Sequence, residues 1–265
     1  MSVAARVFLA AVAVFMAAPI VVIFGVSLNE KRTLFFPPEG LSLAWYAAVW
    51  TDPGWRDAVL TTVGIAFQAA TLSVAIALPI AYALWRRASW FGRIVQLLGV
   101  SPFVLPPVIT ALGALSFWIT VGAYGAGPTV VVSHAIFFTS LPLVCISLGF
   151  QSVDEAVVDA ARTMGATEWT LARTVLAPLV LPYVAAGFAF AFVLSLNEYI
   201  VAYMTVGFTV ETVPIKIFNA LRYGYTPVMA SVSVLFVLTA VAVFALVARF
   251  GDLPRLFGAY PAERD

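Results

Sequence analysis

Long apolar runs separated by short polar stretches dominate this chain. A run of about 20 apolar residues is long enough for an α-helix to cross the ~30 Å hydrocarbon core of a bilayer. Lipid offers the backbone no hydrogen-bond partners, so each run is expected to be helical. The pattern predicts an all-α polytopic membrane protein, residues 1–265 forming one transmembrane domain with six helices in one bundle: 7–28, 58–85, 94–121, 129–150, 179–207 and 227–248.

Two of these runs carry features that could alter their interpretation as simple membrane-spanning helices. The first follows Arg6 and resembles a secretory signal, but it is longer than the ~7 to 15 residues of a signal's apolar region, so we expect it to be retained as a membrane helix. The third contains Pro102, Pro106 and Pro107. Proline lacks a backbone donor, so this run is expected to bend or break near its start.

Composition agrees with a membrane protein. The chain is 63% apolar and only 10% charged, with a mean hydropathy of +1.02, whereas soluble domains are about one-quarter charged. The net charge of +1 gives no electrostatic reason to expect a nucleic-acid partner. The single cysteine, Cys145, cannot form an intrachain disulfide and is interpreted as a small core residue.

The basic residues indicate the orientation. Arg86, Arg87 and Arg93 crowd one short connection that has no acid, and short loops near span ends dominate the positive-inside bias. With the N-terminus inside, both termini are cytoplasmic. The cytoplasmic side then holds Arg6, Arg86, Arg87, Arg93, Arg162, Arg173, Arg249, Arg255 and Arg264, and the outer side holds Lys31, Arg32, Arg56, Lys216 and Arg222.

The cytoplasmic connection 151–178 is expected to fold into two short helices. Ser152 and Glu155 fit a capping box that would begin the first helix. Gly165 would end it in the left-handed conformation, and Thr167 would cap the second. The glycine elbow exposes small residues, which allow another surface to approach closely. Composition alone leaves a docking element and an ordinary amphipathic connection equally open.

A spacing in this connection resembles a known family signature. Asp159-Ala160-Ala161, three residues, Gly165, nine residues and Val175-Leu176-Ala177-Pro178 is similar to EAA, three residues, G, nine residues and I-x-L-P of the permease subunits of binding-protein-dependent ABC importers. In that family the segment forms the coupling helix, which sits in a groove of the ATPase. The resemblance covers most of the chain in span number and loop position. It implies that ATPase coupling involves Asp159, Ala160, Ala161, Gly165, Ala166 and Pro178.

The same resemblance implies the partners and the compartment. The expected partners are two ATPase subunits, a second and related permease chain and an extracytoplasmic solute-binding protein, in the bacterial cytoplasmic (inner) membrane. ATP and Mg are expected on the ATPase, with no cofactor and no catalytic residue on this chain. In agreement, the sequence has no G-x-x-x-x-G-K-[ST] phosphate loop. Transport would follow alternating access driven by the ATPase.

The fifth run contains a single acid, Glu198, which we expect at about bilayer depth. A carboxylate there costs on the order of 2.5–3.5 kcal/mol, so it must face protein, water or a cation. Ala191, Ser195, Glu198, Ala202 and Thr205 would form one small and polar stripe on a continuous helix. The pathway interpretation assigns substrate contact to Ser195, Asn197, Glu198, Tyr199, Ala202 and Thr205, with Tyr199 and Tyr203 available for cation–π contacts. A helix-packing seam remains the alternative.

A second resemblance concerns the solute. The stretch SLNEYIVAYMTVG and the later VPIKIFNALRYGYTP are similar to the C-terminal part of spermidine/putrescine-type permeases, through Ser195, Asn197, Glu198, Tyr199, Pro214, Arg222, Gly224, Thr226 and Pro227. It implies a small cationic, polyamine-like solute. Related permeases for opines, aminophosphonates, thiamine or ferric ion share parts of the pattern and stay as alternatives.

Two other classes of function are weighed against the importer. An ion-gradient-driven secondary transporter would work alone and would not need the elbow. An intramembrane hydrolase would need a nucleophile, a base and an acid, but no acid lies near the only histidine, His134, in the sequence. A lone histidine also lacks the further ligands of a metal site, so His134 is interpreted as a hydrogen-bonded packing residue.

Overall fold

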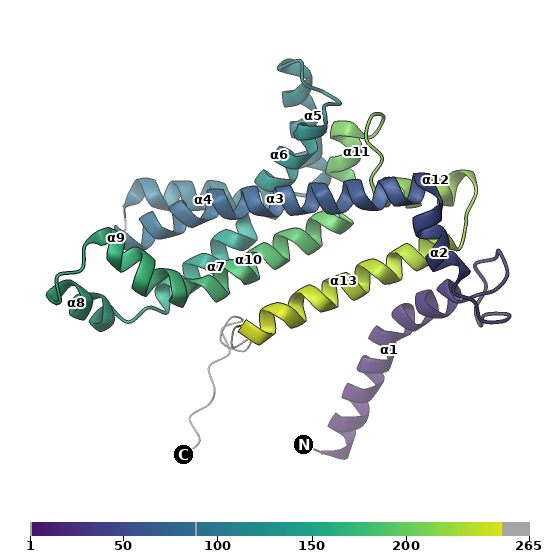
Figure 1. Cartoon of the computed structure of the whole chain (residues 1–265), viewed down its shortest axis with the longest axis horizontal. Coiled ribbons are helices and arrows are strands. Elements are labelled where there is room, and N and C mark those ends of the chain that lie inside the picture. The colour runs from purple at the N-terminus through teal and green to yellow at the C-terminus, as the bar shows by residue number, and fades with distance from the viewer. Residues whose placement is uncertain (1, 88, 251–265) are drawn as a thin grey trace. The chain divides into compact units, whose positions relative to one another are not determined.

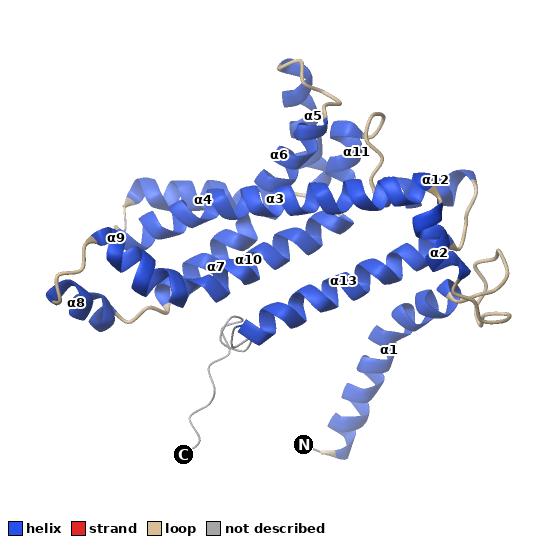
Figure 2. Cartoon of the chain, in the orientation of Figure 1, coloured by secondary structure: helices blue, strands red, loops and turns tan. Residues whose placement is uncertain are grey.

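The computed structural model describes residues 2–87 and 89–250 of the chain. Figure 2 shows helices and connecting loops in this part of the chain, which confirms the all-α class. Arg255 and Arg264, counted above toward the cytoplasmic bias, lie outside the described residues. The elements in order are α1 (Val3–Ser27), α2 (Ala44–Thr51), α3 (Pro53–Arg86), α4 (Trp90–Val104), α5 (Pro107–Thr120), α6 (Gly127–Phe138), α7 (Ser140–Gln151), α8 (Glu155–Thr163), α9 (Glu168–Leu171), the π-helical turn η1 (Ala172–Leu176), α10 (Ala177–Asn197), α11 (Ile200–Val206), α12 (Val213–Tyr223) and α13 (Val228–Phe250).

Membrane-length helices account for the apolar runs. Among the described residues, four helices are long and apolar enough to cross a bilayer: Val3–Ser27, Pro53–Arg86, Glu168–Asn197 and Val228–Arg249. Two bent pairs raise the number to six if each pair is one span. By length and composition, therefore, the helices account for each of the six predicted runs.

Both bent pairs have a proline at or just after the bend. The axes of α4 and α5 meet at 109°, with Pro106 and Pro107 at the break, as expected from the sequence. The 45° bend between α6 and α7 at Thr139 was not predicted. There Pro142 cannot donate to the carbonyl of Phe138, and the Thr139 hydroxyl donates to the Ala135 carbonyl at 2.5 Å, which bends helices.

The fifth run forms two helices, not the continuous helix that we predicted. Helix α10 ends at Asn197, the backbone of Glu198 is extended (φ −76°, ψ 127°), and α11 begins at Ile200. The 21 residues of α10 span about 31 Å at 1.5 Å each, which alone matches the hydrocarbon thickness. Glu198 therefore lies just after the end of a helix of membrane length, and not within one continuous helix as expected.

The described residues fall into two compact units, which are considered separately (Figure 1). One unit comprises Met1–Leu60 and Thr212–Thr239. In it the Trp45 indole donates to the Asn29 carbonyl at 2.6 Å, and the Ser231 hydroxyl donates to the Ser27 carbonyl at 3.4 Å. The other unit comprises the described residues of 61–211 and 240–250, and it contains the predicted coupling and pathway residues.

The core of this second unit lies where α3, α7 and α10 pack together. Helices α7 and α10 run side by side in Figure 1 and approach closely. A Cβ atom built on Gly187 would lie 2.7 Å from the Cα of Pro142, and one on Gly149 would lie 2.8 Å from the Tyr183 side chain. Small residues at these points let the backbones pack directly, as is common between membrane helices. The buried core residues include Ala77, Ala81, Leu143, Ile146, Phe150, Leu176 and Val180.

Candidate functional site

The first helix of the 151–178 segment is capped by Asp154, not by Ser152 as predicted. The Asp154 Oδ1 atom accepts from the Ala156 N–H at 2.9 Å. The Ser152 hydroxyl instead donates to the Gly149 carbonyl at 2.8 Å, near the end of α7. The serine thus completes the preceding helix and the aspartate begins α8, with Glu155 in its first turn, where an acid complements the helix dipole.

The glycine elbow forms as the sequence predicts. Helix α8 ends at Thr163, and Gly165 adopts a left-handed φ of +85°, which is readily accessible only to glycine. The Thr167 hydroxyl then accepts from the Thr170 N–H at 3.2 Å and caps α9. A Cβ atom at position 165 would meet nothing within 4 Å, so the surroundings of the elbow are open.

The two short helices are held to the rest of the unit by buried apolar side chains. Val158 of α8 is 4% exposed and Leu171 of α9 is 1% exposed, and both belong to the core cluster of α3, α7 and α10. Their burial fixes the position of the elbow, because each fully buried side chain of this size contributes about 1.5–3 kcal/mol.

Ion pairs add directional contacts between the segment and the end of α3. The Glu168 carboxylate pairs with Arg86, the last residue of α3, and Arg162 Nη2 lies 3.6 Å from its other oxygen. Arg162 also lies 3.8 Å from Asp159. A polar cavity of about 350 Å³ opens beside these pairs, lined by Trp85, Arg86, Arg87, Glu155, Val158, Asp159 and Arg162.

The elbow presents a mixed small and apolar surface. Among the residues assigned to ATPase coupling, Asp159, Ala160, Gly165 and Pro178 are exposed, while Ala161 and Ala166 are half-buried. Sequence reasoning missed two neighbours, Met164 and Trp169, whose side chains are 88% and 73% exposed. Two large exposed apolar side chains beside a glycine, on a segment that also carries exposed charges, are the composition of a protein contact surface. The sequence did contain a signal for this contact surface, because a methionine and a tryptophan flank the predicted elbow.

At the break in the fifth run, the predicted stripe faces neighbouring helices of the same unit. Ala191, Ser195, Ala202 and Thr205 are buried, and the Glu198 side chain is 8% exposed. Helix α11 packs on α5 and α6. Asn197 is exposed and Tyr199 is half-buried. The six assigned pathway residues therefore divide into a buried supporting set and an accessible pair, Asn197 and Tyr199.

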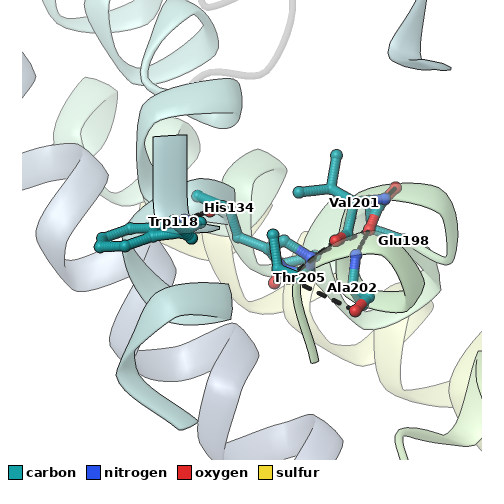
Figure 3. A network of polar contacts seen from close by, with 8 residues as sticks. Trp118, His134, Glu198, Val201, Ala202 and Thr205 are labelled. Carbon is teal, nitrogen blue, oxygen red and sulfur yellow. Dashed lines mark hydrogen bonds and ion pairs between the residues drawn. The ribbon is translucent and has the colours of Figure 1, made fainter. Parts of the chain in front are cut away.

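The Glu198 carboxylate caps α11 and meets His134. Its two oxygens accept from the backbone N–H groups of Val201 at 2.8 Å and Ala202 at 2.9 Å. His134 Nε2 lies 2.9 Å from Glu198 Oε2, and Nδ1 lies 2.8 Å from the Ser195 hydroxyl. In Figure 3 the imidazole points from α6 toward the Glu198 carboxylate. A carboxylate only accepts, so Nε2 carries a hydrogen and donates it to Glu198.

This network brings together residues that are far apart in the sequence. His134 is 1% exposed and hydrogen-bonded, as the packing interpretation expected, but its partners lie 61 and 64 positions away. The order Ser195, His134, Glu198 superficially resembles a hydrolytic triad. Ser195, however, is only 2% exposed, so a carbonyl substrate could not reach its hydroxyl. Among the described residues, no group of three or more His, Cys, Asp or Glu side chains is arranged to hold a metal.

Aromatic rings lie next to the accessible pair. The Tyr199 and Tyr203 rings stack with centroids 5.4 Å apart and planes at 27°, and Phe208 lies 5.9 Å from Tyr203. Phe208 was not assigned from the sequence and is 81% exposed. Aromatic faces attract ammonium groups, so the ring types in this cluster are compatible with contact to a cation.

Known proteins resemble the chain over most of its length. It matches the family described as "Binding-protein-dependent transport system inner membrane component" over residues 2–252. It is 26% identical over 228 residues to the spermidine/putrescine transport system permease protein PotC of Haemophilus influenzae, covering 86% of this chain and 88% of that protein. The corresponding PotC of Escherichia coli (strain K12) is 26% identical over 245 residues, covering 91% and 92%.

The fold agrees with this match. A crystal structure of a bacterial ABC transporter involved in the import of the acidic polysaccharide alginate superposes with a TM-score of 0.67 and 18% identity, covering 94% of this chain and 98% of that one. At this identity the likeness concerns the fold alone. The chain therefore belongs to the binding-protein-dependent ABC transport permeases: a multi-pass subunit of the inner membrane without a catalytic domain or cofactor site, which works with ATPase and binding-protein partners.

Proposed function

We propose that this permease forms the translocation pathway for a small cationic solute of the polyamine class, delivered by an extracytoplasmic binding protein. The observation that carries the proposal is the similarity to two spermidine/putrescine permeases over 86% and 91% of the chain. The stretch at the break in the fifth run adds chemical support. It combines one carboxylate, one exposed amide and a stacked pair of aromatic rings, which are groups that bind an alkylammonium ion.

Within this proposal the six pathway residues have different roles. Asn197 and Tyr199 contact the solute, because their side chains are accessible. Glu198 supplies negative potential next to them, although its oxygens are engaged in hydrogen bonds. The buried members Ser195, Ala202 and Thr205 support the wall behind them.

We further propose that residues 151–178 are the docking segment for the ATPase. Exposed Met164 and Trp169 flank Gly165, and the space around the glycine is open. Closure of the ATPase dimer would then push the elbow, and the push would pass into α10 through α9 and the π-helical turn.

The test is uptake by the complete transporter, with its ATPase, second permease chain and binding protein, in proteoliposomes. ATP-dependent uptake of labelled putrescine or spermidine is expected, with competition by either diamine or triamine and none by 1,4-butanediol, the neutral isostere of putrescine. Absence of cation uptake, or equal competition by the butanediol, would contradict the proposed solute class. Uptake by the lone chain without ATPase would favour a secondary transporter instead.

A further inference from the structure

The break between α10 and α11 is contacted by a side chain of α6, His134, which bonds Glu198. We propose that His134 is a positioning residue that fixes the Glu198 break, and thereby the orientation of Asn197 and Tyr199. The proposal depends on the proposed function only in treating those two residues as solute contacts. The contacts that fix the break involve Ser195, Glu198 and the first turn of α11.

A helix that begins inside a protein needs acceptors for its first N–H groups. At the start of α11 the Glu198 carboxylate supplies them, for Val201 and Ala202. This leaves a carboxylate that is 8% exposed and requires a further donor, since a buried charge without a partner is strongly unfavourable. His134 provides that donor from α6.

The imidazole cannot turn away from this contact without losing another. Its Nδ1 atom is held by the hydroxyl of Ser195, in the last turn of α10, while Nε2 bonds Glu198 at the break. The Phe138 ring packs edge-on against the imidazole, with centroids 5.8 Å apart and planes at 80°. One rigid ring therefore joins the last turn of α10 to Glu198, whose carboxylate accepts from the first turn of α11.

A residue that only fills space would act differently. Loss of the imidazole removes the lateral restraint on the Glu198 carboxylate, so its bonds to the first turn of α11 open more often and the flanking Asn197 and Tyr199 gain freedom. The expected consequence for transport is a higher KM for the solute with a smaller change in kcat, because contact geometry is affected more than the driving step. A packing defect would instead reduce the amount of assembled transporter at unchanged KM.

The experiment compares two His134 variants with a matched neighbour in the complete transporter. His134→Phe keeps the ring shape and removes both hydrogen bonds. His134→Gln keeps one donor and one acceptor and should restore part of the effect. Ser133→Ala is the control, because Ser133 is also buried on α6 but its hydroxyl bonds the Trp118 indole at 2.8 Å rather than Glu198 or Ser195. The measurements are backbone hydrogen exchange over residues 198–204 and KM for putrescine.

For His134→Phe, exchange over 198–204 should rise on the order of 10- to 100-fold, as expected for loss of a hydrogen bond to a charged group. Ser133→Ala should leave it unchanged, and His134→Gln should lie in between. Unchanged exchange in folded His134→Phe or His134→Gln, or an equal rise in Ser133→Ala, would overturn the proposal. If the wild-type transporter imports no polyamine, the proposed solute class fails, whereas the exchange result still decides the role of His134.

Discussion

The glycine elbow allows a sharp test of ATPase docking. Gly165 has a φ of +85°, and a Cβ atom there would meet nothing within 4 Å. Gly122, in the same unit but outside the 151–178 segment, has a φ of +72° and equally open surroundings. Leucine at either position therefore suffers similar backbone strain, and its Cβ atom meets no neighbour in this chain. Only Gly165→Leu would place a side chain on the proposed docking surface.

The size of the strain can be worked out in advance. A non-glycine residue in the left-handed region costs about 1–2 kcal/mol. Folded proteins have a free energy of unfolding of about 5–15 kcal/mol. Even at the lower limit, a loss of 2 kcal/mol leaves about 3 kcal/mol, so about 99% of the molecules stay folded. Strain alone cannot remove transport in either variant.

The assay is ATP-dependent uptake in proteoliposomes, together with recovery of the ATPase in the purified complex. Gly165→Leu should lower uptake at least about 10-fold, equivalent to about 1.4 kcal/mol of lost coupling or binding. Gly122→Leu should retain uptake close to wild type, with a similar small decrease in melting temperature. Equal losses in both variants, or normal uptake and normal ATPase recovery in Gly165→Leu, would refute the docking role.

Three further changes test other parts of the structure. Gly187→Ala should destabilise the protein by about 1–3 kcal/mol, because its Cβ would meet the α7 backbone at 2.7 Å, whereas Gly113→Ala has open space; thermal unfolding in detergent compares them. Glu198→Gln should lower uptake of a cation, normalised to chain amount, more than it lowers expression, since its amide NH₂ cannot accept from the first turn of α11. Asp154→Ala should destabilise α8 by about 1 kcal/mol and Ser152→Ala should not, as measured by hydrogen exchange over 155–158.

Local chemistry made much of the fold predictable. The apolar runs gave the membrane helices, and the family resemblance is confirmed by the match over residues 2–252. Gly165 and Thr167 act as predicted, because a left-handed glycine and a threonine cap depend on a few neighbouring residues only. Pro106 likewise breaks the third run by removing its own donor.

The sequence predictions were wrong at two positions, the start of α8 and the break at Glu198. At both, the local structure depends on hydrogen-bond partners that compete with one another or lie far apart in the sequence. Ser152 and Asp154 both suit a helix N-terminus, and the choice depends on where α7 ends, because Ser152 is used there. The residues around the break at Glu198 include no proline or glycine, which are the usual sequence signals for the end of a helix. It depends on His134, which is 64 positions away and could not be paired with Glu198 from one sequence. The assignment of solute contacts remains a proposal that the uptake experiments test.

The elbow and the Glu198 break lie at opposite ends of one continuous helical stretch, Glu168–Asn197. Its 30 residues make a rod of about 45 Å at 1.5 Å per residue. A π-helical turn lies within it just before Pro178, where the Ala177 N–H reaches back to the Ala172 carbonyl. If the elbow docks the ATPase as proposed, a few degrees of tilt at that end would displace the Glu198 end by several ångströms, and this helix would act as a lever between nucleotide turnover and solute passage.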